Sequence, residues 1–466
     1  MYTRAYTLTH KLLIFIAMPA LFWLSAIQAT ANSEPSLTDL DSEFQEVLDA
    51  FLASHSLQQS NSSFARTSAL AREVKQTESA LEASSIIRRH KNLIVEQATA
   101  KEFHGLIKRL YDNNDTATVR DLTIAINKQG NAQYTSINYY LLADYYAKRS
   151  NWPGVLAALA KVDSNLLSKA DAQYYAMLHG FALQGEKKHR KAAKHYKTIV
   201  KNSPYYAHAR LNEGTAYLKQ GWWTEAHIEF ENAIQQLEVN PGLGAEYSDF
   251  NNRILVTLGF SQIHYEFYRD ARNTLRRVSL DSDYATKAMM GLGIAAAHQK
   301  DFTGALNIFQ LLQEKQPQDK NVDESYLLVP FGFEELQDPA KAGLQYERAI
   351  EYFKARLGEI AKAQQQLEQA SSGQLLNTIA SLNQRSRELY ASSTLIPDYF
   401  LDNFETLMAM QSIQSPTGVR SKVQALTDKY QRQIKNLVKQ NITQRQQALN
   451  SYLSQAKFGV AKLYDQ

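Results

Sequence analysis

Four glycines recur at nearly constant spacing through the middle of the chain, and this recurrence constrains the fold more than any other feature. Two of the three intervals are 34 residues and the middle one is 45. A fixed period of roughly 20 to 50 residues is typical of repeat architectures, in which each unit packs on its neighbours. We therefore expect an array of stacked units anchored at Gly180, Gly214, Gly259 and Gly293.

Other positions repeat in register with these glycines. An alanine stands twelve residues after each glycine and a bulky residue sixteen after it, while aromatic residues stand nine after the last three. Small residues let two helices approach closely, and large side chains fill the space between them. The pattern predicts helical hairpins packed through Ala192, Ala226, Ala271 and Ala305, with Tyr196, Phe230, Leu275 and Phe309 as the bulky residues and Trp223, Tyr268 and Phe302 as the aromatics.

This pattern resembles the tetratricopeptide repeat, a helix-turn-helix unit of about 34 residues. The resemblance implies an all-α fold, a right-handed superhelix of helical hairpins. Degenerate units flank the four strong ones, with Trp152 upstream and with Pro330 in the place of the glycine downstream. The stretch "YRDARNTLRRVSLDSDYATKAMMGLGIAAA" also resembles exported tetratricopeptide proteins of proteobacteria, which implies a scaffold in the periplasm without implying an activity.

The first 31 residues have the pattern of a secretory signal peptide. Arg4 and Lys11 precede the apolar run Leu12–Ile27, and Ala29-Thr30-Ala31 has the form of a cleavage site. The run is short for a membrane span, and Pro19 interrupts it. We expect export to the periplasm and no integral span after the leader is removed. An uncleaved inner-membrane anchor is the alternative.

Composition narrows the class of protein further. The chain has no cysteine, which excludes disulfides and thiolate metal sites and suits an exported helical protein of a bacterial periplasm. The formal net charge is only +4, so we expect no nucleic-acid partner. The ends of the chain have opposite charge, since residues 32–65 hold six acidic residues and no Lys or Arg, whereas residues 416–466 hold nine Lys or Arg and two Asp.

These patterns predict the organisation of the whole chain. The segment after Pro416 is rich in Gln and has few apolar residues, so as a helix it must pack on the repeats or on an earlier long helix. The predicted parts are a signal peptide (1–31), an N-terminal helical region that holds divergent repeats as one alternative (32–134), the repeat array (135–338), a long-helix extension with a helical hairpin (339–415) and a long basic C-terminal helix (416–466).

The sequence contains no motif of a known catalytic site. HExxH, a Walker loop and G-x-S-x-G are all missing. His189 and His195 stand on a basic helix, where a solvated surface is the better interpretation than metal binding. We therefore predict that the protein is not an enzyme and uses neither a cofactor nor a metal.

The resemblance implies that the first helix of each unit lines a groove for a partner. Three residues before and one after each glycine should form an apolar floor with a partly basic margin, which suits an amphipathic helix of a partner protein. Alternatively, the chain's own acidic N-terminal segment or its C-terminal helix fills this groove. The predicted groove residues are Tyr174, Met177, Phe181, Leu211, Lys219, Arg253, Val256, Phe260, His264, Lys287, Met290, Ile294 and His298.

Two adjacent tryptophans have different expected roles. Trp223 stands where Tyr268 and Phe302 stand in later units, so we expect it to be buried between two helices. Trp222 follows Gly221 in a turn and is the better candidate for a surface contact.

Three functional hypotheses follow from the sequence. The leading one is a non-enzymatic periplasmic scaffold that binds protein partners in a cell-envelope assembly. The second is a cell-wall enzyme or a glycan- or peptide-binding protein that uses the array as a ligand cradle. The third is a structural protein that self-associates through its C-terminal helix.

Overall fold

The computed structural model describes residues 36–55, 64–239, 245–315, 319–371, 373–375 and 396–464. The chain divides into two compact units, residues 1–40 and 41–466. The predicted signal peptide lies outside the described residues. Within the described ranges, no helix is both long and apolar enough to cross a bilayer.

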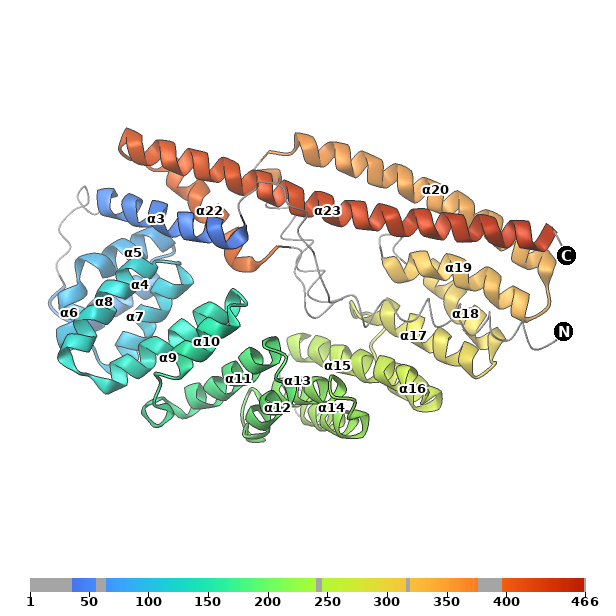
Figure 1. The fold of residues 1–466 in the computed structure, drawn as a ribbon, viewed down its shortest axis with the longest axis horizontal. Helices are drawn as coiled ribbons and strands as arrows, with labels where there is room; N and C mark the ends of the chain where they lie inside the picture. The colour runs from blue at the N-terminus through green and yellow to red at the C-terminus, as the bar shows by residue number, and fades with distance from the viewer. Residues whose placement is uncertain are drawn as a thin grey trace. The chain divides into compact units, whose positions relative to one another are not determined.

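The described chain is all-α, as predicted (Figure 1). The N-terminal helices are α3 (Leu37–His55), α4 (Thr67–Gln76), α5 (Ala80–Arg89) and α6 (Lys91–Gln97). The hairpins that follow are α7 (Ala100–Asp112) with α8 (Thr116–Gln129), α9 (Ala132–Lys148) with α10 (Trp152–Leu159), α11 (Lys169–Gly185) with α12 (His189–Lys197), α13 (Tyr206–Leu218) with α14 (Trp223–Glu238), α15 (Ala245–His264) with α16 (Tyr268–Leu275), α17 (Ala285–His298) with α18 (Phe302–Gln313), and α19 (Lys320–Glu335) with α20 (Pro339–Gln369). The 3-10 turn η1 (Ser164–Leu166) precedes α11, and the chain ends in α22 (Asp398–Ser412) and α23 (Thr417–Tyr464).

One turn geometry recurs in all seven of these hairpins. A residue two or three positions past the end of the first helix has a left-handed backbone. The N–H of the next residue donates to the carbonyl five residues before it, at 2.7–3.0 Å. This is the Schellman motif, which satisfies carbonyls at a helix C-terminus. The left-handed residues are Asn114, Ser150, Lys187, Gly221, Glu266, Lys300 and Gln337.

The recurring turn shows that the repeat geometry begins upstream of the strong sequence pattern. Asn114, with φ 60°, joins α7 to α8 in the same way that Gly221, with φ 77°, joins α13 to α14. The hairpin of α7 and α8 therefore has the same turn as the later units. The predicted boundary between residues 134 and 135 falls inside α9.

Because only one of these seven turns uses glycine, the others carry backbone strain that a substitution can relieve. Lys300 is exposed and has φ 62°, in the region that disfavours side chains with a Cβ. We expect Lys300→Gly to raise the free energy of unfolding by about 0.5–1 kcal/mol, measured by urea denaturation. Gly221→Ala, the converse change, should lower it by a similar amount. A loss of stability in Lys300→Gly would contradict this account.

The anchor glycines allow the close helix contacts that the spacing predicts. A Cβ placed on Gly214 would lie 2.5 Å from the ring of Phe230, and one on Gly259 would lie 2.5 Å from Leu275. Gly180 and Gly293 have the same relation to Tyr196 and Phe309. Each bulky residue therefore packs on the glycine sixteen positions before it. The four predicted alanines, Ala192, Ala226, Ala271 and Ala305, are all buried as well.

In the last hairpin, a helix from the end of the chain supplies the glycine. Pro330 replaces the anchor glycine there, and the bulky residue Tyr346 instead packs on Gly459 of α23, where a Cβ would lie 2.5 Å from its ring. Figure 1 shows α23 running alongside α20. Leu327, Phe353 and Leu449 share one apolar cluster across α19, α20 and α23. The Gln-rich segment thus persists as a helix because it packs on the earlier long helix.

The other half of α23 packs on α3 and α22. Tyr430 of α23 stacks on Phe400 of α22, with ring centroids 4.2 Å apart, and contacts Phe44 of α3. Lys429 pairs with Glu43 at 2.7 Å. The acidic N-terminal segment and the basic C-terminal segment therefore meet here.

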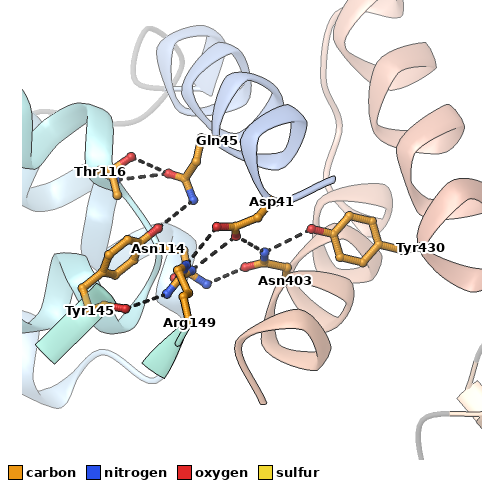
Figure 2. A network of polar contacts seen from close by, with 8 residues as sticks. All are labelled: Asp41, Gln45, Asn114, Thr116, Tyr145, Arg149, Asn403 and Tyr430. Carbon is orange, nitrogen blue, oxygen red and sulfur yellow. Dashed lines mark hydrogen bonds and ion pairs between the residues drawn. The ribbon is translucent and has the colours of Figure 1, made fainter. Parts of the chain in front are cut away.

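A buried polar network joins the same helices to the turns of the first two hairpins (Figure 2). Asn403 of α22 is fully buried, and its amide donates to Asp41 at 2.8 Å and to the hydroxyl of Tyr430 at 3.1 Å. Arg149, which follows α9, pairs with Asp41 at 2.9 Å and donates to the side-chain oxygen of Asn114 at 2.6 Å. One carboxylate thus connects α3 both to a repeat turn and to α22.

Candidate functional site

The predicted groove does not have the open apolar floor expected from the sequence. Met177, Leu211, Val256, Met290 and Ile294 are at most 6% exposed. Met177 belongs to an apolar cluster with Leu183 and Tyr196, so it packs inside its own hairpin and against its neighbour. The expectation that these five residues face a partner is therefore wrong: helix packing within the array has already taken their apolar surface.

The margin of the predicted groove remains accessible in part. Lys219 and His264 are exposed. His298 stacks on Tyr268 of the preceding hairpin, with ring centroids 4.5 Å apart. The half-buried margin residues are Tyr174, Phe181, Arg253, Phe260, Lys287 and His298.

Like charges come together along α15, α17 and α19. Lys287 lies over the ring of Phe260 at 5.6 Å. Burial and the neighbouring charges of Lys320 and Arg253 lower the pKa of Lys287 to about 8, and Asp319 opposes this shift. Burial also lowers the pKa of Lys320. Arg253 and Lys287, one from each of two adjacent hairpins, thus form a desolvated basic site.

In the last hairpin, α23 covers the residues at groove positions. Tyr452 of α23 donates to Glu324 of α19 at 3.0 Å, and Leu327 lies in the apolar cluster that α23 completes. Of the two intramolecular alternatives for the groove, the C-terminal helix therefore does cover this hairpin.

Both tryptophans of the adjacent pair are partly exposed, Trp222 at 41% and Trp223 at 37%. The expectation that Trp223 is buried between two helices is wrong. Its ring instead leans on the turn of the next hairpin, with its centroid 4.9 Å from that of Phe267 and 5.9 Å from that of Tyr265. Trp222 stacks on Tyr217 at 5.8 Å. We call these five residues, Tyr217, Trp222, Trp223, Tyr265 and Phe267, the turn cluster.

Two members of the turn cluster occupy positions that would otherwise cap a helix. The residue after the left-handed residue is the N-cap of each second helix, and Asp115, Asn151, Asp301 and Asp338 cap their helices with side-chain oxygens. Trp222 and Phe267 occupy the same position in α14 and α16, where they make no capping hydrogen bond. A missing cap costs about 1 kcal/mol. Lys188 of α12 makes no capping hydrogen bond either, and at the other two uncapped positions large aromatic side chains stand at the expense of helix stability.

Sequence reasoning selected Trp222 but missed most of its neighbours. Tyr217, Tyr265 and Phe267 come from positions that the repeat pattern does not mark. Phe267 is the member that the sequence could have indicated, because it stands directly before Tyr268 and so matches Trp222 in register. The contact between the two turns requires the three-dimensional stacking of adjacent hairpins.

The geometry of the described residues offers no clear centre for metal chemistry. Within these ranges, no group of three or more His, Asp or Glu side chains is placed to hold a metal ion. A cavity of about 440 Å³ lies between the start of α20 and the end of α23, and its lining includes Leu344, Glu347, Val460, Leu463 and Tyr464.

Comparison with known proteins gives one family match. Residues 266–320 match a family model described as tetratricopeptide repeat. No curated protein matches the chain. Similar solved structures include MamA MSR-1 C2 (17% identity, TM-score 0.31, covering 40% of this chain and 98% of that one). They also include the apo form of the quorum sensor NprR from B. thuringiensis (12% identity, TM-score 0.36, covering 73% of this chain and 97% of that one). A third is the P58(IPK) TPR domain (10% identity, TM-score 0.20, covering 80% of this chain and 98% of that one).

The matched segment carries the same geometry as the rest of the array. It holds α16, α17 and α18, with the left-handed turns at Glu266 and Lys300 and the packing of Phe309 on Gly293. Since the other hairpins repeat this turn and the strong units repeat this packing, the match describes the architecture of the array and not one isolated hairpin. Residues 266–320 thus match the tetratricopeptide repeat, and the described array around them is built of helical hairpins of the same kind.

Proposed function

We propose that this protein is a non-enzymatic periplasmic scaffold that binds a protein partner of a cell-envelope assembly through the turn cluster. The repeat fold in general supports a role in protein–protein interaction. The observation that carries the proposal is the replacement of two helix caps by aromatic residues, the exposed Trp222 and the half-buried Phe267. Trp and Tyr are enriched among the residues that contribute most to binding at protein interfaces.

The location rests on the N-terminal sequence. The apolar run, the basic residues before it and Ala29-Thr30-Ala31 support export, and the lack of cysteine suits a helical periplasmic protein. Fusing residues 1–40 to a reporter enzyme that is active only outside the cytoplasm tests this part of the proposal. An inactive reporter would exclude export through this leader.

A single substitution should separate binding from stability at the turn cluster. We expect Trp222→Asp to raise the free energy of unfolding by about 0.5–1 kcal/mol, because aspartate caps α14 as Asp301 caps α18. The same change should abolish partner capture, since it removes the most exposed ring of the cluster. The measurements are urea denaturation, and cross-linking in intact cells followed by mass spectrometry of the captured proteins.

Phe458→Asp is the matched control for this test. Phe458 is 71% exposed on α23 and lies outside the turn cluster. This variant should retain every partner that the unmodified chain captures. If Trp222→Asp captures the same partners as Phe458→Asp, the turn cluster is not the binding surface.

Self-association is a second candidate, favoured by apolar exposure near the cavity between α20 and α23. Leu344 is 63% exposed and Tyr464 is 81% exposed, and both line that cavity. A second copy that covers these side chains would give a dimer, which Leu344→Glu should dissociate. Light scattering of both proteins decides the question, and a monomeric unmodified chain would rule this candidate out.

A further inference from the structure

Helix α12 and the turns beside it carry an unusually dense group of cations. Residues 187–201 include seven Lys or Arg and no Asp or Glu, and all seven are exposed. On the opposite side of the helix, Ala192, Ala193 and Tyr196 are buried against the array. We call the cations the basic stripe: Lys187, Lys188, Arg190, Lys191, Lys194, Lys197 and Lys201.

The rest of the protein does little to neutralise this stripe. Among the described residues it makes a single ion pair, between Lys188 and Glu186 at 3.7 Å. Two exposed carboxylates of α14 pair with Arg277 and not with the stripe. Glu238 lies 2.8 Å from Arg277, and Glu231 lies 3.8 Å from it. The positive charge of the basic stripe therefore faces solvent and calls for an anion from outside the chain.

The arrangement favours an extended anionic surface over a narrow ligand. The cations lie along the exposed side of one helix and its flanking turns, a length of roughly 20 Å. Val200, 51% exposed, stands between Lys197 and Lys201, so an apolar side chain accompanies the charges. Clusters of four to eight Lys or Arg are typical of segments that bind acidic phospholipids, and apolar residues among them can enter the headgroup region.

We propose that the basic stripe of α12 binds the surface of a bilayer that contains acidic phospholipids. This inference goes beyond the proposed scaffold function, because it uses a different helix and a different kind of partner from the turn cluster. Binding through the stripe would hold the repeat array against a membrane while the turn cluster engages a protein.

The test is co-sedimentation of the purified full chain with two kinds of vesicle, phosphatidylcholine alone and phosphatidylcholine with one third phosphatidylglycerol. We expect tighter binding to the acidic vesicles, and we expect this increment to vanish at high salt. Replacing Lys191, Lys194, Lys197 and Lys201 with Gln should weaken binding to the acidic vesicles by about a hundredfold to a thousandfold. Any binding through the leader, which carries Arg4 and Lys11, would be equal for the two proteins.

A matched variant controls for net charge. Lys354, Lys362, Lys422 and Lys457 are also exposed helical residues, and replacing these four with Gln removes the same charge from other helices. This variant should bind the acidic vesicles as the unmodified chain does. Equal binding of both vesicle types by the unmodified chain, or equal losses in the two variants, would overturn the proposal. So would binding of soluble poly-glutamate without binding of vesicles, which would assign the stripe to an acidic protein.

Discussion

Asp323→Ala should destabilise the protein by about 3–5 kcal/mol, one of the two largest effects expected of a single substitution here. The Asp323 carboxylate on α19 is fully buried and contacts Arg445 of α23. Tyr352 of α20 donates to it at 2.7 Å, and Arg356 of α20 lies 3.7 Å away. Burial raises the pKa of Asp323, and Arg445 opposes that shift. Its removal takes away the carboxylate that Arg445 and Arg356 share, and Arg356 keeps only its pair with the exposed Glu359.

Urea denaturation measures this loss, and a neighbouring pair supplies the control. Glu359 also pairs with Arg356, but its side chain is 61% exposed. Because exposed ion pairs contribute little, Glu359→Ala should cost less than about 1 kcal/mol. A cost for Asp323→Ala as small as that for Glu359→Ala would show that the buried cluster does not hold α23 on the last hairpin.

Arg149→Met should also destabilise the protein by about 3–5 kcal/mol, at the network beside the other half of α23. The Arg149 guanidinium pairs with Asp41 at 2.9 Å and lies 3.6 Å from the centroid of the Tyr145 ring. Methionine fills much of the same volume but leaves Asp41, whose side chain is 15% exposed, without its cation. Denaturation reports the total loss. Faster amide hydrogen exchange in α3 and α22 than in α17 would place the loss at this network.

Arg149→Lys distinguishes charge from geometry at this site. Lysine keeps the positive charge but cannot form the two-nitrogen contact that Arg149 makes with both oxygens of Asp41. We therefore expect the free energy of unfolding of Arg149→Lys to lie between that of the unmodified chain and that of Arg149→Met. If lysine is as destabilising as methionine, the orientation of the guanidinium matters more than its charge. If methionine costs less than about 1 kcal/mol, the network does not stabilise the fold.

The sequence predicts the strong repeats well because their contacts need particular residue types. Only glycine fits beneath Phe230 or Leu275, so Gly214 and Gly259 can be read directly from the spacing. The hairpin of α7 and α8 carries no such pattern. Its turn depends on a left-handed residue, and this array places Asn, Ser, Lys, Glu and Gln as well as Gly at that position. A conformation that many residue types adopt leaves a weak pattern in a sequence.

The candidate site was harder to predict, because exposure depends on how neighbouring units stack. Met177 and Trp223 illustrate the two errors. Spacing along one helix gives the direction of the Met177 side chain, but the adjacent helices bury it. Trp223 keeps the register of a packing residue, but its ring extends to Phe267 in the next turn and stays 37% exposed. The exposure of both side chains depends on contacts between units, and the periodicity within one unit carries no information about those contacts.

The contact between α3 and α23 also has a consequence for biosynthesis. Lys429 and Glu43 are separated by 386 residues, so at roughly 5–20 residues per second about 20–80 s of translation pass before the second partner exists. During that interval the ring of Phe44 lacks Tyr430, and the carboxylate of Asp41 lacks Asn403. The repeats between them contact their immediate neighbours and can fold as they emerge. The helices made first are thus the last to gain all their native contacts.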